Sequence, residues 1–434
     1  MVPQQSPNTR TQRAANGQRF TDTELATFVA EAIAGTNLAD KRVLAIIPDA
    51  TRTMPMPAMF CVLTDALPQV DFLIALGTHP PMSDSAILRH FGISAASRHT
   101  THAHVGIYNH AWQDRDALVS LGCISSETMS AISEGMIEAA PEVLANKRLL
   151  EYDALIVAGP VFPHEVAGFS GGNKYFFPGV SGAEILHLFH WLGALITNPS
   201  INGVKHTPVR RVIDAAAALI PVPKYAFCLN VVHGESRAIA FGKPEDAWEI
   251  AADWAAETHV VYKEHPYDSV LAICPERYQD IWTAGKCMYK LENVVADGGE
   301  LIIYAPHITQ VSVTHGALLR RIGYHTRDYF LAQMDRFVDV PGGILAHSTH
   351  VRGIGTYEDG VERPRVHVVL ATSIPEAECR AINLGYRDPA TIDPAGWRDK
   401  GDSGRLLIPD AGETLFRLTA NNPQPTPLRV FAEM

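Results

Sequence analysis

The segment RVLAIIP at residues 42–48 is a short apolar run that ends directly before Asp49. Such a run is typical of a strand that is buried on both faces of a parallel sheet. Similar runs lie at residues 70–76, 154–158, 225–232, 269–273, 301–304 and 366–371. Helical patterns lie at residues 182–196, 209–219, 244–259 and 375–382. Strands that alternate with helices predict an α/β fold with mostly parallel sheets.

The length of 434 residues and the apolar fraction of 47% suit two domains with an active-site cleft between them. We expect a disordered tail over residues 1–20 and an N-terminal cofactor-binding and catalytic domain over 21–264. A C-terminal α/β domain over 265–401 follows. The Gly and Pro residues of segment 402–434 would allow it to return to the first domain.

Composition excludes several classes of protein. The 47 acidic against 36 basic residues give a net charge of −11, which disfavours nucleic acid as a partner. No apolar run approaches the roughly 18 residues that a membrane span needs. The 6 cysteines form no CxxC pair, which indicates reduced thiols, a cytoplasmic location and no cysteine-based zinc site.

Two of the predicted strands are followed by residues that suit catalysis. DATR at residues 49–52 places Asp49 and Arg52 after the first strand, and GTHPP at 77–81 places His79 after the second. Polar residues at the carboxyl ends of parallel strands line the ligand crevice. Arg52 suits a carboxylate or phosphate, and His79 suits a general base. An Asp–Arg pair that only stabilises a loop and a structural histidine remain the alternatives.

The most specific segment is PHEVAGFSGGNKYFFPG at residues 163–179. Its glycines and prolines predict a shaped loop rather than a regular element. Backbone N–H groups around Gly171 and Gly172, together with Lys174, suit an anion, and His164 lies nearby in the sequence. The segment lacks the Walker pattern. A structural turn and a simple phosphate-binding module remain open.

Other candidates lie on predicted helices and in the second domain. His187 and His190 are three residues apart and share a helix face, where packing in an apolar helix is the favoured interpretation for His187. Trp282 and Lys286 lie in a segment that could close over an anionic ligand. The histidines whose roles stay open are His187, His307, His315, His347 and His350.

Together, DATR, GTHPP, the 163–179 segment and the following His190 resemble the nickel-pincer-nucleotide lactate racemase family. The resemblance implies an isomerase whose cofactor is nickel pyridinium-3,5-bisthiocarboxylic acid mononucleotide. It implies that Lys174 holds this cofactor covalently and that His190 binds the nickel. It further implies that His79 and His164 are catalytic, so that a base can meet the hydroxyl of either enantiomer.

The same resemblance gives roles to the remaining candidates. Asp49, Arg52, Gly171, Gly172 and Lys286 would bind the cofactor. Arg52, Trp282 and Lys286 would contact a 2-hydroxy acid substrate. Enzymes that synthesise the cofactor would be transient partners.

One departure bears on the substrate. Lactate-type members of the family have a Tyr-Gln pair where this chain has Trp282 and Thr283. The histidine-rich second domain favours a larger polar acid, such as the sugar acid gluconate, and hence C2 epimerisation. The alternatives are racemisation of lactate or another short 2-hydroxy acid, a zinc hydrolase built on three histidines, and a nonenzymatic carrier of the nickel cofactor.

Overall fold

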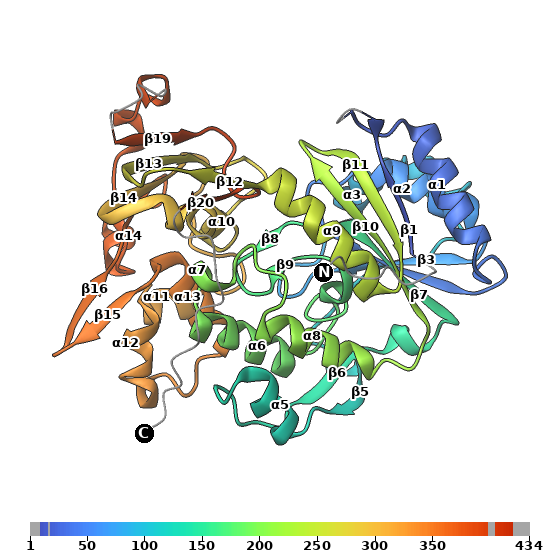
Figure 1. The fold of residues 1–434 in the computed structure, drawn as a ribbon, viewed down its shortest axis with the longest axis horizontal. Helices are drawn as coiled ribbons and strands as arrows, with labels where there is room; N and C mark the ends of the chain where they lie inside the picture. Colours follow the sequence, from blue (N-terminus) through green and yellow to red (C-terminus); the bar gives the residue numbers. More distant parts are fainter. Residues whose placement is uncertain (1–8, 16–17, 398–403, 420–434) are drawn as a thin grey trace.

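A computed structural model describes residues 9–15, 18–397 and 404–419, and its architecture is mixed α/β (Figure 1). The first sheet has the strand order β1-β11-β10-β7-β2-β3-β4. Its strands are Arg10–Arg13, Glu235–Gly242, Lys224–Val232, Ala154–Pro160, Val43–Pro48, Val70–Ala75 and Ile107–Asn109. The pairs from β10 to β4 are parallel, and β11 pairs antiparallel with both β10 and β1. The predicted fold class is confirmed.

Strand β2 shows why this sheet forms. Val43, Ala45 and Ile47 face the core under α1 (Asp22–Ala34) and α2 (Met56–Ala66). Leu44 and Ile46 face the opposite core, which α6 (Ala183–Ile196), α8 (Pro208–Ala218) and α9 (Pro244–His259) cover. Because side chains alternate along a strand, an all-apolar run is stable only where both faces are covered.

The second sheet is parallel throughout and has the order β18-β17-β14-β13-β19. Its strands are Gly385–Tyr386, His367–Thr372, Val295–Ala305, Tyr267–Ile273 and Arg405–Ile408. Helices α10 (Ile281–Leu291) and α13 (Gly342–Arg352) contribute to the main core against this sheet.

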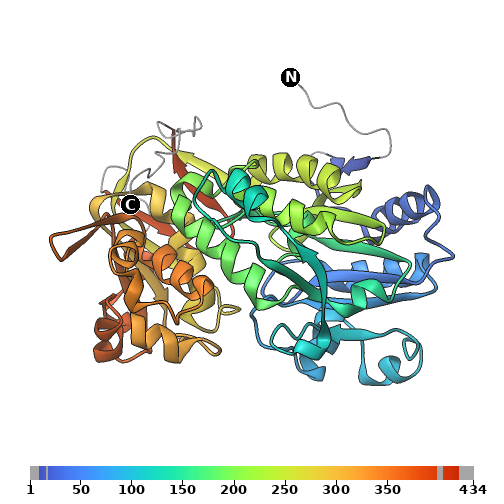
Figure 2. The same cartoon turned by 90° about the horizontal axis from the view of Figure 1, so that it is seen from below.

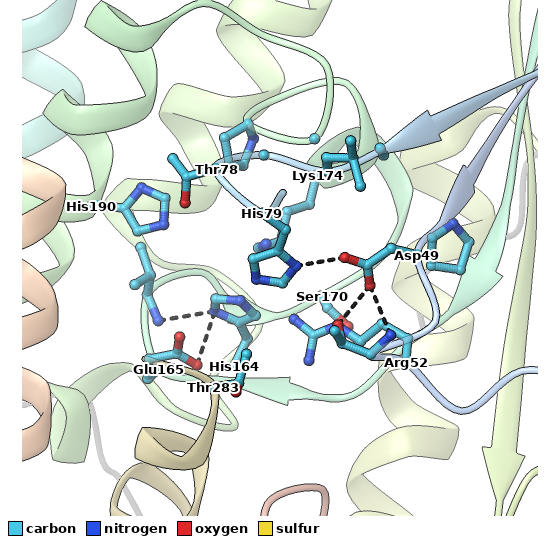
Figure 3. A pocket seen from close by; sticks show the side chains of 18 of the residues that line it. Asp49, Arg52, Thr78, His79, His164, Glu165, Ser170, Lys174, His190 and Thr283 are labelled. Atoms are coloured by element: carbon cyan, nitrogen blue, oxygen red, sulfur yellow. Dashed lines mark hydrogen bonds and ion pairs between the residues drawn. The ribbon is translucent and has the colours of Figure 1, made fainter. Parts of the chain in front are cut away.

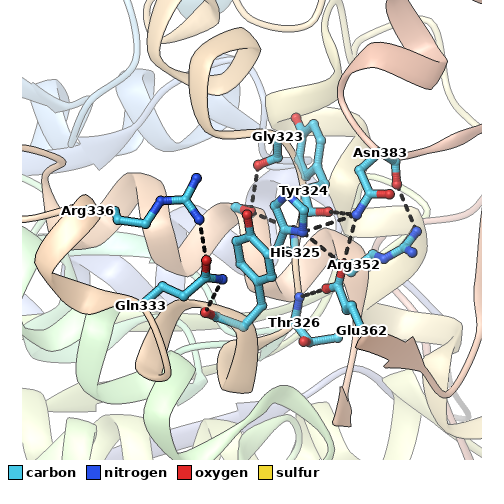
Figure 4. A network of polar contacts seen from close by, with 11 residues as sticks. Gly323, Tyr324, His325, Thr326, Gln333, Arg336, Arg352, Glu362 and Asn383 are labelled. Carbon is cyan, nitrogen blue, oxygen red and sulfur yellow. Dashed lines mark hydrogen bonds and ion pairs between the residues drawn. The ribbon is translucent and has the colours of Figure 1, made fainter. Parts of the chain in front are cut away.

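A polar network fixes the carboxyl end of α13 (Figure 4). Glu362 accepts a hydrogen bond from the backbone N–H of Thr326 at 2.6 Å, and its other oxygen lies 2.8 Å from His325 Nδ1. Asn383 donates to Glu362 at 3.0 Å and accepts from Arg352, the last residue of α13, at 2.8 Å. The network ties the hairpin of β15 (Gly355–Glu358) and β16 (Val361–Pro364) to the helix.

The two sheets are joined at several places (Figures 1 and 2). Strand β12 (Val260–Lys263) pairs in parallel with β20 (Leu415–Leu418), and α6 packs along α13. Arg417 on β20 donates to the carbonyls of Asn202 and Pro199 at 2.6 Å each. The predicted boundary at 264/265 thus falls between β12 and β13. Within the predicted 402–434 segment, β19 joins the second sheet and β20 pairs with the last strand before the boundary. The division of the chain into domains at these boundaries remains a proposal.

The expected disordered tail needs a correction for its described residues. Arg10–Arg13 form β1, an edge strand that pairs with β11. Arg10 makes an ion pair with Glu31 at 2.8 Å, and Arg13 makes one with Glu257 at 2.6 Å. The polar composition that suggested disorder is that of a solvent-facing edge strand. Residues 1–8 and 16–17 of the predicted tail lie outside the part of the chain that the structure describes.

The remaining elements are short or peripheral. The helices are α3 (Asp84–Phe91), α4 (Ala95–His99), α5 (Ser126–Ser133), α7 (Asn198–Ile201), α11 (Gly316–Ile322), α12 (Arg327–Leu331) and α14 (Glu376–Ala381). Strand β5 (Leu118–Cys123) pairs antiparallel with β6 (Glu142–Asn146), and α5 lies between them in the sequence. No helix in the described ranges is long and apolar enough to cross a membrane. The 6 cysteines form no disulfide.

The glycine-rich loop is held by the helices behind it. It contains the paired strands β8 (Pro163–His164) and β9 (Gly168–Phe169) and the 3-10 turn η4 (Gly172–Tyr175). Arg210 of α8 donates to the carbonyls of Phe169 at 2.5 Å and Gly171 at 3.3 Å. Its guanidinium lies over the ring of Trp248, whose indole N–H donates to the Ser170 carbonyl. The shape of the loop therefore depends on α8 and α9.

We expect Arg210→Ala to destabilise the fold by about 2–4 kcal/mol, because two buried carbonyls each lose a partner at about 1–3 kcal/mol. Urea unfolding followed by circular dichroism measures this change. The matched control is Arg211→Ala on the same helix, which removes only exposed contacts, an ion pair with Glu134 and a hydrogen bond to the Ile132 carbonyl, and should cost less than about 1 kcal/mol. Equal effects of the two substitutions would contradict this account of the loop.

Candidate active site

One pocket of about 160 Å³ lies where the carboxyl ends of β2, β3 and β7 face α6, α10 and α13 (Figure 3). Both sheets contribute to its walls, so the predicted cleft is present. Nine of the ten predicted site residues line it: Asp49, Arg52, His79, His164, Gly171, Lys174, His190, Trp282 and Lys286. These residues come from segments far apart in the sequence, and only the fold brings them together.

Gly172 is the exception. A Cβ atom at this residue would meet the Trp248 side chain at 2.8 Å, so this glycine is needed where the loop packs on α9. It does not appear in the pocket wall. At Gly171, by contrast, φ is +86° and a Cβ atom would meet Val161 at 2.5 Å, while the residue itself lines the pocket. The paired glycines therefore face different surroundings.

Asp49 and His79 form a close pair. The distance between Asp49 Oδ2 and His79 Nδ1 is 2.5 Å, and Asp49 Oδ1 accepts from the backbone N–H and the hydroxyl of Thr51. Burial raises the pKa of Asp49, but the charge of His79, these hydrogen bonds and the charge of Lys286 outweigh it and hold the pKa well below its ordinary value. Asp49 is therefore an ionised carboxylate that orients His79.

His164 is bonded differently. Its Nδ1 accepts hydrogen bonds from the backbone N–H groups of Val166 at 3.1 Å and Ala167 at 3.4 Å. Burial, with the positive charges of Lys174 and Arg52 among the further causes, lowers the pKa of His164 well below its ordinary value. The ring is therefore neutral near pH 7.

The pocket collects positive charge. Burial, and after it the charge of Arg52, lower the pKa of Lys174 to about 7. Burial and Arg52 likewise lower the pKa of Lys286 to about 7. Lys286 Nζ has no hydrogen-bond partner and lies 4.5 Å from the centre of the Tyr278 ring. Such a set of enclosed cations suits an anionic ligand, and a lysine with a substantial neutral fraction at pH 7 can act as a nucleophile.

His190 lies on α6 with one ring nitrogen engaged. Its Nδ1 is 2.6 Å from the Leu186 carbonyl, so Nδ1–H donates and Nε2 keeps its lone pair. Burial lowers the pKa of His190 to about 3, although the bond to Leu186 opposes this shift. A neutral imidazole that is oriented by a backbone carbonyl is the usual state of a histidine metal ligand.

No group of three His, Cys, Asp or Glu side chains in the described ranges converges closely enough to hold a metal ion. A zinc hydrolase needs three such ligands. The alternative built on His79, His164 and His190 therefore finds no ligand set within these ranges. A metal whose other ligands come from a cofactor does not need a set of three protein ligands.

The wall contributed by the second sheet is aromatic and rich in histidine. The ring of Trp282 stacks on the ring of His347, with 4.1 Å between the ring centres. The centre of the same indole ring lies 4.4 Å from that of the His315 ring. Both nitrogens of His347 contact tyrosine hydroxyls, that of Tyr289 at 2.8 Å and that of Tyr324 at 3.3 Å. These contacts fix the orientation of Trp282 in the pocket wall.

The open histidines fall into two groups. His347 and His350 line the pocket from α13. Outside the pocket wall, His187 lies edge-on to Trp112, His307 Nε2 is 2.9 Å from the Tyr278 carbonyl, and His315 packs on Trp282. The packed environment favoured for His187 is thus the one observed.

Sequence reasoning missed several lining residues, among them Glu165, Tyr175 and Tyr289. Glu165 could have been found as the only acidic residue inside the 163–179 segment. The helical spacing from Trp282 to Lys286 and Tyr289 also indicates one shared face.

The chain is similar to lactate racemases in sequence and in fold. A model described as the lactate racemase N-terminal domain matches residues 23–202. Lactate racemases of Lactiplantibacillus plantarum and Thermoanaerobacterium thermosaccharolyticum are 25% and 28% identical over 278 and 279 residues. Each match covers 61% of this chain, which spans 59% and 60% of the lengths of these relatives.

Two solved structures resemble the whole chain. A protein from Thermotoga maritima is 30% identical with a TM-score of 0.85, covering 94% of this chain and 100% of its own. The lactate racemase apoprotein of T. thermosaccharolyticum has a TM-score of 0.68 at 18% identity, over 92% and 93% of the two chains, and shows the shared fold.

We expect the reactivity of the Lys174 amine to level off above about pH 7. Only the neutral amine reacts, and a pKa of about 7 makes most of it neutral at mild pH. Reductive methylation at a series of pH values, quantified by peptide mass spectrometry, measures this. Free Nα-acetyl-lysine in the same tube, with a pKa near 10.4, should keep gaining rate up to about pH 10. Lys174→Arg identifies the peptide, and a rate at Lys174 that follows the free amino acid would contradict the expectation.

Proposed function

Because the chain belongs to the lactate racemase family, we propose that it is an isomerase that inverts the configuration at C2 of a 2-hydroxy acid. The observation that carries the proposal is the convergence of His79, His164, Lys174 and His190 on one pocket. Two histidines for proton transfer, an amine for attachment and an imidazole for a metal are the groups that such a reaction requires.

We further propose that the pocket takes the nickel-pincer nucleotide, attached to Lys174 and bound through nickel to His190. The residues fit this group, since Lys174 has a neutral fraction near pH 7 and His190 keeps Nε2 free. Lys286 Nζ, which is buried without a hydrogen-bond partner, and Arg52 suit its phosphate and the carboxylate of the substrate. When bound, the cofactor supplies an acceptor for the hydrogen on C2 as hydride.

The residues of the chain would manage the rest of the chemistry. Asp49 orients His79, which takes the proton of the substrate hydroxyl as the C2 hydrogen leaves. His164 meets the same pocket from β8. Trp282, held between His315 and His347, forms a fixed wall against the substrate. Asp49 and Gly171 complete the proposed cofactor contacts.

We propose a larger polar acid, such as the sugar acid gluconate, as the substrate in preference to lactate. The second-sheet wall presents Thr283, Tyr289, His347 and His350 to the pocket. Hydroxyl and imidazole groups of this kind suit the extra hydroxyls of a sugar acid. Delivery by cofactor-synthesis enzymes and a cytoplasmic location, in keeping with the free thiols, belong to the same proposal.

The substrate is tested with protein produced together with the cofactor-synthesis enzymes. We expect inversion of D-gluconate at C2 at a rate at least about 10-fold above that of D- or L-lactate, which corresponds to about 1.4 kcal/mol in the transition state. Chiral chromatography of the products measures both rates. Turnover of lactate alone would overturn the sugar-acid preference. A loaded protein that turns over no 2-hydroxy acid would favour the carrier.

Attachment and metal binding are tested separately from activity. We expect Lys174→Ala to lose the covalent adduct in intact-mass spectra. His190→Ala should keep the adduct but lose nickel affinity by about 10-fold or more, since even loss of an outer partner of a metal has this effect. His187→Ala, on the same helix but outside the pocket wall, is the matched control and should retain nickel. Nickel retention by His190→Ala would contradict the assignment.

A further inference from the structure

Two carboxylates, Asp49 and Glu165, are present among the described residues that line the pocket. Both oxygens of Asp49 are engaged by the protein itself. His79 Nδ1 lies 2.5 Å from one oxygen, and the backbone N–H and the hydroxyl of Thr51 donate to the other. Asp49 thus serves to orient His79, and this leaves the role of Glu165 to be explained.

The Glu165 carboxylate is mostly buried but has no strong partner. Its side chain is 18% exposed, and Oε2 lies 3.4 Å from His164 Nδ1, which is longer than an ordinary hydrogen bond. No other residue in the described ranges donates a hydrogen bond to this carboxylate or forms an ion pair with it. A buried charge is ordinarily paired or hydrogen-bonded, so an open carboxylate in a pocket wall points to a ligand.

Glu165 keeps its charge in this position. Burial raises the pKa of Glu165, but the positive charges of His350 and Lys290 are the first of several causes that outweigh burial and hold the pKa below its ordinary value. An ionised carboxylate has acceptor positions only. It therefore accepts hydrogen bonds from hydroxyl groups, repels a second carboxylate and stays unpaired beside a methyl group.

A second open group lies in the same wall. His350 of α13 is 4% exposed, and its Nε2 is buried without a hydrogen-bond partner among the residues that the structure describes. An imidazole nitrogen donates or accepts according to where its proton lies, and a hydroxyl group can do both. Hydroxyl groups therefore match the open carboxylate of Glu165 and the open nitrogen of His350 better than an apolar chain does.

We propose that Glu165 is a specificity-determining residue that accepts hydrogen bonds from hydroxyl groups of the substrate beyond C2, with His350 in the same recognition surface. This inference rests on the proposed function and deepens it, because it names the substrate class: 2-hydroxy acids whose chain carries further neutral hydroxyl groups. Figure 3 shows Glu165 beside His164 and Thr283, on the side of the pocket away from Lys174. The attachment point proposed for the cofactor thus lies elsewhere, which favours the substrate as the group that Glu165 meets.

Three acids that share the C1 carboxylate and the C2 hydroxyl differ in what they bring to Glu165. Gluconate brings hydroxyl groups, lactate brings a methyl group, and malate brings a second carboxylate. A site that is built to bond a substrate hydroxyl rejects an analogue without it, because the polar groups of the site are then left unpaired. We therefore expect gluconate to be preferred over both lactate and malate.

Glu165→Gln tests the acceptor in protein that carries the cofactor. The amide keeps the size of the side chain but removes its charge and one acceptor oxygen. We expect kcat/KM for D-gluconate to fall at least about 10-fold, mainly through KM, since a hydrogen bond to a charged group is lost. The value for lactate should change less than about 3-fold, and the value for malate relative to gluconate should rise. A purely structural role would lower gluconate and lactate alike, because both carry one carboxylate.

Glu165→Asp separates hydrogen bonding from charge. The aspartate keeps the negative charge among the buried lysines but withdraws the carboxylate by one carbon, so we expect the same selective loss for gluconate. The matched control is Glu184→Gln on α6, an exposed carboxylate outside the pocket wall that accepts from the Glu142 backbone N–H. It should leave the gluconate and lactate values unchanged. Intact mass and nickel content show whether each variant is loaded.

Binding is measured apart from turnover by isothermal titration calorimetry of the same loaded proteins. We expect the dissociation constant for D-gluconate to rise at least about 10-fold in Glu165→Gln and Glu165→Asp, with that for lactate unchanged. Equal losses for both acids would overturn the inference. So would loss of the adduct or of nickel in these variants, since Glu165 would then serve the cofactor.

The outcomes separate the two proposals. If the unmodified protein inverts lactate and binds gluconate no more tightly, the inference fails while the proposed function stands. If the unmodified loaded protein inverts no 2-hydroxy acid, the proposed function fails, and the calorimetry still decides whether Glu165 selects hydroxylated acids.

Discussion

The pocket depends on one physical constraint: its positively charged side chains are buried away from water. Burial, together with the charge of Arg52, lowers the pKa of Lys174, Lys286 and Lys290 to about 7 each. The same desolvation, with these charges added, keeps His164 neutral. Each of these cations becomes more stable when an anion arrives beside it. An anionic cofactor and an anionic substrate therefore offset the cost of a pocket that would otherwise hold too much unpaired charge.

The sequence allowed part of this arrangement to be predicted. Parallel strands buried on both faces appear as continuous apolar runs, so β2, β3 and β7 could be predicted, and the candidate polar residues after them line one pocket. The edge strand β1 was missed because all four of its residues are polar, like those of a tail. Spacing alone could not decide which of two adjacent glycines faces the pocket, since that depends on Trp248 behind the loop.

The second half of the site was harder to predict for a physical reason. His347, His350 and Tyr289 reach the pocket only because α6 packs along α13 and α10 lies beside them. A helical pattern indicates a shared face but not what that face meets. Lys290 illustrates the dependence, since its ammonium group donates to the Pro163 carbonyl, directly before His164. The position of a residue in the glycine-rich loop is thus set partly by a helix that packs against the second sheet.

The pairing of β12 with β20 has a consequence for movement. The chain leaves the first sheet along β12, and β20 lies beside it, runs in the same direction and is hydrogen-bonded to it in parallel. A two-stranded connection of this kind resists shear but tolerates twisting. A change in the angle between the two sheets would therefore have to accommodate these backbone hydrogen bonds as well as the packing of α6 on α13.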